Sequence, residues 1–231
     1  MHIKGLQKLT LLDYPGHLAA TVFLGGCGFR CPFCHNSALV LEPASLPDID
    51  DASFFSLLEK RRGILDGVAI TGGEPLLSPD IDAFMQRIRG MGFAVKLDTN
   101  GAHPKALRRV LEAGLVQYVA MDIKNAPSEY ARTVGLPQAP MEALRESVSL
   151  LMEGKVDFEF RTTLVKGFHT PGGMAEIGRW IAGAPHYFLQ GFVDSGAVLS
   201  PGLAAFSPEE AEELRQAVLP FVPSAQLRGI G

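Results

Sequence analysis

The sequence predicts an α/β protein with a parallel sheet, folded as a partial (β/α)6 barrel. Short apolar runs alternate with longer segments whose apolar residues recur at helical spacing, which is typical of repeated strand–helix units. Four successive apolar runs end in polar or glycine-containing motifs, and barrels of parallel strands gather functional groups at the carboxyl ends of their strands. No linker-like break interrupts the pattern, so we expect one domain over residues 1–231.

Six apolar runs account for the predicted strands. They are residues 18–24, 67–70, 93–97, 115–120, 156–165 and 186–193. Before the first of them, residues 6–16 form a mixed lead-in that closes in Asp13-Tyr14-Pro15-Gly16, a turn signal.

The segments between the strands carry helix signals. We predict helices over residues 48–62, 78–90, 104–114, 128–134, 141–153 and 170–182, and a last helix that begins at Ser207. Ser78 is the expected N-cap of the second helix, with Pro79 at its first position. Pro104 opens the third helix and Gly114 closes it. Ser207 also begins a capping box, Ser-Pro-Glu-Glu.

Composition excludes several classes of protein. Apolar residues make up 47% of the chain and charged residues 20%, which excludes disorder as its main character. A net charge of −4 gives no electrostatic footprint for nucleic acid, so we expect no nucleic-acid partner. The longest apolar runs are too short to cross a bilayer, and we expect neither membrane association nor a secretory signal. We therefore expect a cytoplasmic protein.

All three cysteines lie in one short stretch, as Cys27, Cys31 and Cys34. On an ideal helix these positions share a face, so a buried stripe of small apolar residues is the structural alternative. The neighbouring glycines weaken a helix, however, and Pro32 removes a backbone donor from what would be its interior. The stretch is therefore predicted as a loop that holds a metal.

The number of cysteines restricts the kind of metal centre. Iron–sulfur clusters usually take four thiolates, and structural zinc takes four protein ligands in a closed tetrahedron. Three cysteines leave one coordination position open, and an open position is where metal chemistry takes place. The alternative is a Cys3His zinc site with His35 as fourth ligand, although His35 directly follows Cys34 and adjacent residues rarely reach one ion.

The spacing CxxxCxxC, with the aromatic Phe33 before the last cysteine, resembles the signature of radical S-adenosylmethionine (radical SAM) enzymes. The resemblance implies that Cys27, Cys31 and Cys34 hold three irons of a [4Fe–4S] cluster. It also implies that the fourth iron chelates the amine and carboxylate of SAM. Phe33 packs on the adenine in this interpretation, or shields the cluster.

The second predicted strand ends in Thr-Gly-Gly-Glu-Pro, residues 71–75. Alone, this motif would indicate a tight turn that needs positive φ angles. It resembles the radical SAM element that contacts the methionine amino group. Gly72 and Gly73 would then allow close approach of the ligand to the backbone, and the Glu74 carboxylate would receive the ammonium.

The next strand ends in Asp-Thr-Asn-Gly, residues 98–101. Asn-Gly is a strong hairpin signal, so a structural turn is the alternative, but a helix rather than a strand is predicted to follow. A carboxylate at a strand end can accept hydrogen bonds from ribose hydroxyls. We therefore expect Asp98, and next Asn100, to contact the cofactor.

Charged residues end the fourth predicted strand and interrupt the fifth. Asp122 and Lys124 lie two residues apart, so their side chains share a face. A solvated ion pair, which contributes about 0–1 kcal/mol, is the structural alternative. Facing inward, Lys124 would bind the SAM carboxylate, and Asp122 would orient it or the incoming peptide. Arg161 needs a partner in an apolar strand, either a ligand carboxylate, Asp122 or Asp98.

Five motifs together resemble the glycyl-radical-activating branch of these enzymes. They are residues 12–16, 27–36 (ending Cys-His-Asn), 71–75, 98–101 and 121–124. The match is to the anaerobic ribonucleoside-triphosphate reductase activating protein family, which is similar to pyruvate formate-lyase activating enzyme. The chain departs from the pattern at Leu24-Gly25-Gly26, where a Gln is expected near Gly25. It also lacks the additional cysteines of auxiliary clusters.

This resemblance implies a function. The reduced cluster cleaves SAM to methionine and a 5′-deoxyadenosyl radical, which abstracts a hydrogen from a glycine of a partner glycyl radical enzyme. The cofactors do the radical chemistry, and the protein sets geometry and excludes water and oxygen. Flavodoxin or ferredoxin is the expected electron donor.

Two rival functions remain open. One is a small-molecule radical SAM enzyme resembling 7-carboxy-7-deazaguanine synthase, against which Asp-Tyr-Pro-Gly and Cys-His-Asn favour the activase. The other is a zinc-binding interaction domain without catalysis. Gln190 is a further cofactor-site candidate, whereas His169 and His186 are predicted to be satisfied or solvated histidines.

Overall fold

The strands form the partial barrel that the sequence predicts. The computed structural model describes residues 1–194 and 196–230. Its described strands make one eight-stranded sheet, ordered β1-β2-β3-β4-β5-β6-β7-β8. Strands β2 to β8 pair in parallel, and β1 pairs with β2 antiparallel at the edge. Because β1 and β8 do not pair with each other within the described residues, the barrel stays open along one side.

The predicted strands correspond to β2–β7, and two more strands flank them. The bounds are β1 Ile3–Thr10, β2 Ala19–Leu24, β3 Gly67–Gly72, β4 Ala94–Thr99, β5 Tyr118–Asp122, β6 Asp157–Leu164, β7 Tyr187–Gly191 and β8 Gln226–Arg228. Residues 6–10 of the mixed lead-in thus belong to strand β1, a correction to the sequence prediction. This edge strand has only its two end residues buried and contains no apolar run, and β8 has three residues, none of them fully buried.

The helices follow the predicted order, but the predicted start of α3 is wrong. Their bounds are α1 Ser37–Leu41, α2 Asp51–Lys60, α3 Ile81–Gly90, α4 Pro104–Glu112, α5 Tyr130–Thr133, α6 Met141–Met152, α7 Pro171–Trp180 and α8 Pro208–Val218. Helix α1 was not predicted. Ser78 is not the N-cap of α3, because a 3-10 turn over Pro75–Leu77 ends at Ser78, and Asp80 precedes α3 instead. The capping box at the start of α8 is confirmed.

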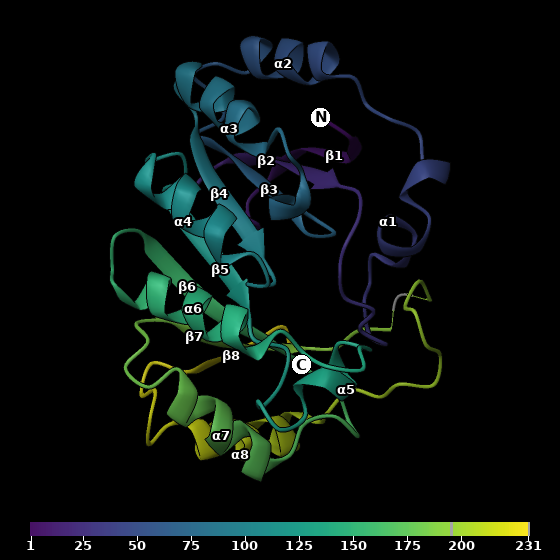
Figure 1. Ribbon diagram of the computed structural model, residues 1–231, viewed down its shortest axis with the longest axis vertical. Helices are drawn as coiled ribbons and strands as arrows, with labels where there is room; N and C mark the ends of the chain where they lie inside the picture. The colour runs from purple at the N-terminus through teal and green to yellow at the C-terminus, as the bar shows by residue number, and fades with distance from the viewer. Residues whose placement is uncertain (195, 231) are drawn as a thin grey trace.

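The helices cover the outer side of the curved sheet, and the cysteine loop lies on the other side, near α1 and α5 (Figure 1). Strand residues that face outward pack on the helices in one continuous apolar core. In it, Phe54 of α2 and Phe84 of α3 have ring centroids 5.3 Å apart. Strands covered on both faces read as apolar runs, which is why the sequence revealed them.

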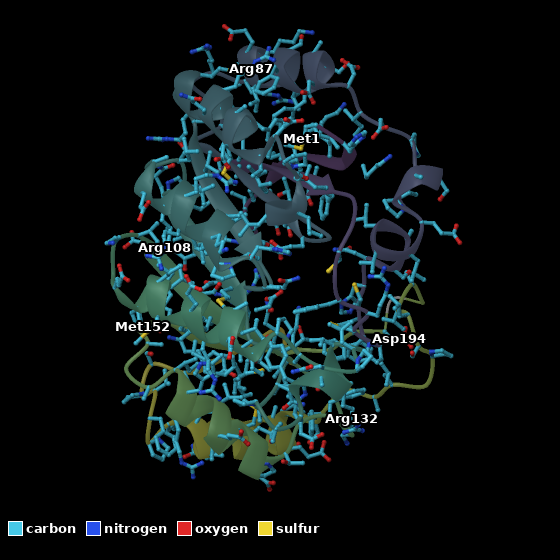
Figure 2. All side chains as sticks on the ribbon, viewed as in Figure 1. Met1, Arg87, Arg108, Arg132, Met152 and Asp194 are labelled. Carbon is cyan, nitrogen blue, oxygen red and sulfur yellow. The ribbon has the colours of Figure 1, made fainter. Side chains whose placement is uncertain are left out.

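Alternate strand residues point into the barrel, and several of these are charged. They include Lys96 and Asp98 of β4, Asp122 of β5, and Glu159 and Arg161 of β6. Other charged side chains, such as Arg87, Arg108 and Arg132, lie on the outside of the molecule (Figure 2). Within the described residues, no helix is both long and apolar enough to cross a membrane.

Candidate active site

A cavity of about 240 Å³ opens where the parallel strands end. Its wall contains nearly all of the site residues predicted from the sequence. These are Cys27, Cys31, Phe33, Cys34, Gly72, Gly73, Asp98, Asn100, Asp122, Lys124 and Arg161. Glu74 is the predicted site residue that does not line it. Motifs spread over more than a hundred residues thus meet at one place.

The cysteine stretch is a loop, as predicted, and backbone hydrogen bonds hold it in position. Gly26 N–H donates to the Leu39 carbonyl over 2.8 Å, and Arg30 N–H donates to the Val134 carbonyl over 2.8 Å. A side chain at Gly73 would meet this loop, since its Cβ would lie 1.9 Å from the Gly26 carbonyl oxygen. The loop and the glycine motif therefore pack backbone against backbone.

The thiols share the cavity but do not converge on one ion. Within the described residues, no group of three or more His, Cys, Asp or Glu side chains lies close enough to hold a metal ion. The nitrogen Nε2 of His35 lies 2.6 Å from the Val193 carbonyl oxygen. The described side chains are therefore not arranged around a single ion, and a cluster, in which each thiolate binds a different iron, does not require such convergence.

Burial keeps two of the thiols protonated in the absence of a metal. It raises the pKa of Cys31 to about 12, and it raises the pKa of Cys27 as well. Metal binding to such thiols releases their protons. Cys27 Sγ also accepts hydrogen bonds from Phe29 N–H at 3.4 Å and from Asn100 Nδ2 at 3.6 Å. Asn100 thus reaches the cysteine loop itself, which the sequence did not predict.

Glu74 is buried within the protein rather than exposed in the cavity. Its Oε1 accepts hydrogen bonds from Thr99 Oγ1 at 2.9 Å and Leu76 N–H at 3.1 Å, and its Oε2 accepts one from Asn100 N–H at 2.7 Å. Burial raises its pKa to about 7. The carboxylate joins the glycine motif to the end of β4, so the geometry does not support its predicted contact with a ligand ammonium.

The Asp-Thr-Asn-Gly segment is a strand-to-helix connection rather than a hairpin turn. It ends β4 and leads to α4, and Gly101 has φ +77°. The Asn100 Oδ1 accepts a hydrogen bond from Ala102 N–H at 2.9 Å, which shapes the turn and leaves Nδ2 directed at Cys27. The hairpin alternative is excluded, and Asp98 and Asn100 both face the cavity.

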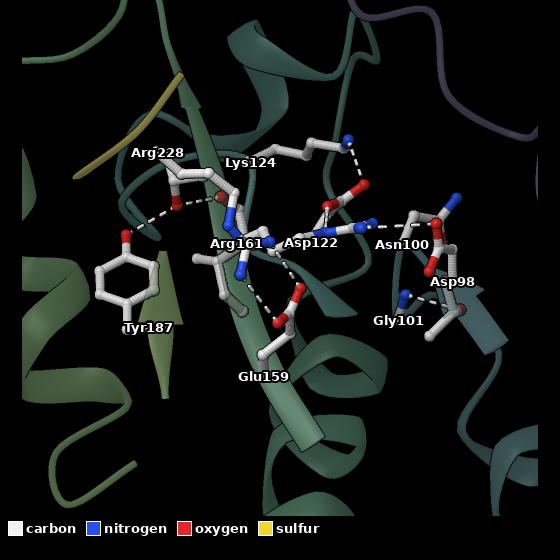
Figure 3. A network of polar contacts seen from close by, with 12 residues as sticks. Asp98, Asn100, Gly101, Asp122, Lys124, Glu159, Arg161, Tyr187 and Arg228 are labelled. Atoms are coloured by element: carbon white, nitrogen blue, oxygen red, sulfur yellow. Dashed lines mark hydrogen bonds and ion pairs between the residues drawn. The ribbon is translucent and has the colours of Figure 1, made fainter. Parts of the chain in front are cut away.

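Arg161 joins two strands through their carboxylates (Figure 3). Its Nε donates to Asp122 Oδ1 over 3.0 Å, and its NH1 group lies 3.4 Å from Asp98 Oδ2. Lys124 Nζ lies 2.9 Å from Asp122 Oδ2, and Lys96 pairs with Asp98. Three cations against two carboxylates leave the network with one net positive charge.

In this network, the neighbouring charges affect the pKa values of the aspartates more than burial does. Burial by itself raises the pKa of Asp122, but Arg161 and Lys124 more than offset this and lower it to about 2. Arg161 and Lys96 likewise hold the pKa of Asp98 below its usual value against the effect of burial. Both aspartates are therefore ionised at neutral pH. Asp122 and Lys124 form the ion pair that was the structural alternative, but the pair lies in the cavity wall, where the inward-facing prediction placed both residues.

Two buried residues hold the backbone of Lys124. Its N–H donates to Tyr130 Oη over 3.2 Å, and its carbonyl oxygen lies 3.0 Å from His169 Nε2. The other ring nitrogen of His169 accepts the N–H of Val165 at 3.0 Å. His169 is thus a satisfied histidine, as predicted. The ring of Phe168 also meets Phe33 edge-on at 5.6 Å.

Six further polar side chains line the cavity: His35, Asn36, Thr71, Thr99, Thr163 and Gln190. The sequence offered His35 as an alternative zinc ligand and Gln190 as a further cofactor-site candidate, and it assigned no contact to the side chains of the other four. The Asn36 Nδ2 donates to the Gly72 carbonyl over 2.9 Å, which ties the cysteine loop to the glycine motif. Thr163 follows Arg161 by two residues on β6, and this spacing was the available sequence signal for its inward position.

A barrel of parallel strands with three thiols and a charged cavity at the strand ends defines an enzyme class that binds a metallocofactor and an organic ligand. The chain belongs to the radical SAM superfamily, whose sequence model matches residues 21–170. Its cofactors are therefore a [4Fe–4S] cluster and SAM. Three cysteines, the whole complement of the chain, suit a cluster with one corner left for a ligand.

The chain is also similar to individual proteins in sequence and in fold. A protein of Methanocaldococcus jannaschii named "Putative glycyl-radical enzyme activating enzyme" is 28% identical over 233 residues, which cover 99% of this chain and 90% of that protein. The 7-carboxy-7-deazaguanine synthase of Rickettsia prowazekii is 33% identical over 98 residues, 41% of this chain and 40% of that one. Streptococcus suis SuiB bound to S-adenosylmethionine shares the fold, with a TM-score of 0.66 and 12% identity over 91% of this chain and 52% of that one.

Proposed function

We propose that this radical SAM enzyme activates a glycyl radical enzyme by removing a hydrogen atom from one of its glycines. The observation that carries the proposal is the full-length likeness to a relative named as such an activating enzyme. The motifs that resemble this branch also line one cavity, and the barrel beside that cavity is open along one side. An open side suits the entry of a glycine-bearing segment of another protein.

Cys27, Cys31 and Cys34 would hold three irons of the cluster. When bound, the reduced cluster and SAM supply the organic radical that takes the hydrogen atom. The chain itself contributes a water-restricting cavity and fixed polar groups. Phe33, which is buried beside Cys34, shields the loop in this assignment or packs on the adenine.

The other predicted residues are assigned to different chemical groups of SAM. The network of Asp98, Asp122, Lys96, Lys124 and Arg161 has one net positive charge, which suits the methionine carboxylate. Lys124 is the proposed direct contact, and Asp122 orients it over 2.9 Å.

Residues at the ends of β3 and β4 are assigned to the ribose and to the amino group of SAM. We assign the ribose to Asp98 and Asn100 and the amino group to the backbone at Gly72 and Gly73. Glu74 acts indirectly in this assignment, by holding the glycine motif against β4.

The proposal also names partners and a compartment. The protein substrate is a glycyl radical enzyme of the anaerobic ribonucleotide reductase type or a related one. Flavodoxin or ferredoxin is the electron donor, and the setting is a cytoplasm low in oxygen.

A small-molecule reaction is the second candidate. It is favoured by the 33% identity to a 7-carboxy-7-deazaguanine synthase, which extends over 41% of this chain. The first candidate rests on a likeness that covers 99% of the chain.

The deciding experiment mixes reconstituted, reduced protein and SAM with candidate glycyl radical enzymes and records electron paramagnetic resonance spectra. A glycyl doublet that depends on SAM supports the activase. If every candidate remains silent while 5′-deoxyadenosine accumulates together with a modified small metabolite, the activase assignment is wrong and the second candidate replaces it.

A further inference from the structure

Most polar side chains of the cavity wall already have partners in the protein. Within the described residues, the uncharged exceptions are the hydroxyls of Thr71 and Thr163 and the carboxamide of Gln190. Thr71 belongs to the glycine motif on β3. Thr163 and Gln190 lie elsewhere, on β6 and β7, and the proposed function has given them no role.

Thr163 and Gln190 form a pair. They are direct register neighbours in the parallel β6–β7 ladder, where adjacent strands are about 4.8 Å apart. Thr163 also lies one inward position beyond Arg161, toward the carboxyl end of β6. The pair is therefore beside the charged network but outside it, and it presents a neutral, hydrogen-bonding surface to the cavity.

This surface is suited to one chemical group. A carboxamide carries a donor and an acceptor in one plane, so it pairs bidentately with a group that also presents a donor beside an acceptor. The backbone N–H and C=O of one extended residue are such a pair, because they point to the same edge of the chain, whereas the N–H and C=O of a single trans peptide group point in opposite directions. Glycine has no side chain to recognise, so an enzyme that selects a glycine has to bind the backbone around it. Half-buried polar groups without a partner also favour a ligand that pairs with them.

We infer that Gln190, assisted by Thr163, binds the backbone N–H and C=O of an extended residue next to the target glycine of the protein substrate. This inference rests on the proposed function and adds the residues that recognise the substrate. The groups assigned to SAM come mainly from β3, β4 and β5, whereas this pair is on β6 and β7, which leaves it for the second ligand. The edge of adenine is the competing occupant, since it also offers adjacent donors and acceptors.

The test uses the reconstituted holoenzyme, the partner that gives the glycyl doublet, and a fluorescent peptide of that partner spanning the glycine. Gln190→Ala should weaken peptide binding and raise the KM for the partner by about 10-fold, and Thr163→Val by about 3-fold, as expected for lost hydrogen bonds. The dissociation constant for SAM should stay unchanged. Gln86→Ala is the matched control, because it makes the same substitution at an exposed position of α3, outside the cavity, and should leave peptide binding unchanged.

A second probe tests the hydrogen bond that a backbone N–H of the peptide donates. A peptide N-methylated beside the glycine should bind the wild type about 10-fold more weakly, because it has lost one donor, yet bind Gln190→Ala as well as the unmodified peptide does. Iron content and thermal midpoint show that each variant is folded and loaded.

The outcomes separate the two proposals. If the wild type produces the glycyl doublet but Gln190→Ala binds the peptide normally, the inference fails alone. It also fails if N-methylation costs the wild type and Gln190→Ala equally, or if Gln190→Ala weakens SAM instead, which would assign the residue to adenine. If the wild type produces no glycyl radical with any partner, the proposed function and the inference fall together.

Discussion

Arg161 on β6 donates through Nε to Asp122 on β5 over 3.0 Å, and with the same guanidinium it faces Asp98 on β4 at 3.4 Å. One side chain thus contacts two carboxylates from two strands inside the barrel. Removing it would leave each carboxylate with one lysine, Lys124 for Asp122 and Lys96 for Asp98, and would lower the net charge of the network from +1 to zero.

Arg161→Ala should therefore destabilise the protein by about 1.5–3 kcal/mol, the usual contribution of a hydrogen bond to a charged group. It should also weaken SAM binding, because the network loses its net positive charge. Urea unfolding and calorimetric titration with SAM measure the two effects. Arg108→Ala is the control, since its pair with Glu146 is exposed and contributes about 0–1 kcal/mol. Equal losses in the two variants would contradict this account of the network.

Glu74 should make stability depend on pH. Its pKa is about 7 in the folded protein, because the carboxyl is buried, and near 4.5 when unfolded. Between these values the folded state binds more protons, so stability is full below about pH 4.5 and falls as the pH rises to about 7, by up to roughly 3 kcal/mol. Unfolding curves across this range, compared with Glu74→Gln, isolate the effect. The wild type should show the steeper decline, and parallel curves would exclude a raised pKa for Glu74.

Gly73→Ala should displace the cysteine loop. The new Cβ would lie 1.9 Å from the Gly26 carbonyl oxygen, so backbone has to move, at a cost of about 1–3 kcal/mol. Iron incorporation should fall with it. Gly90→Ala is the matched control, because no atom lies within 4 Å of its Cβ and alanine favours the helix by about 1 kcal/mol. Normal iron content in Gly73→Ala would show that the loop does not depend on this contact.

His35→Ala and Cys31→Ala should separate the two kinds of metal centre. His35 contacts the Val193 carbonyl, so its removal should leave the iron content and the broad absorbance near ~400 nm intact. Cys31→Ala should abolish both. Metal analysis after anaerobic reconstitution provides the measurement. If the wild type instead binds stoichiometric zinc and His35→Ala loses it, the protein is a zinc-binding domain.

Local sequence determined the strand–helix order and the motifs that meet in the cavity. Apolar runs and helix caps are short-range signals, and the three thiols, two glycines and polar strand ends lie beside the strands that place them. The same reasoning missed β1 and β8, since edge strands with little burial have no apolar run, and it misplaced the start of α3.

Only the tertiary structure decided which side chains meet. It paired Arg161 with carboxylates from two other strands, buried the Glu74 carboxyl, and brought His169 to the carbonyl of Lys124. It also left the side chains of Thr163 and Gln190 without partners among the residues that the structure describes. These contacts join residues tens of positions apart, and they depend on the face and register of each strand. The spacing of residues in the sequence shows which side chains of one strand share a face of the sheet. Which side chains lie opposite them on the next strand is decided only when the strands pair in the folded protein.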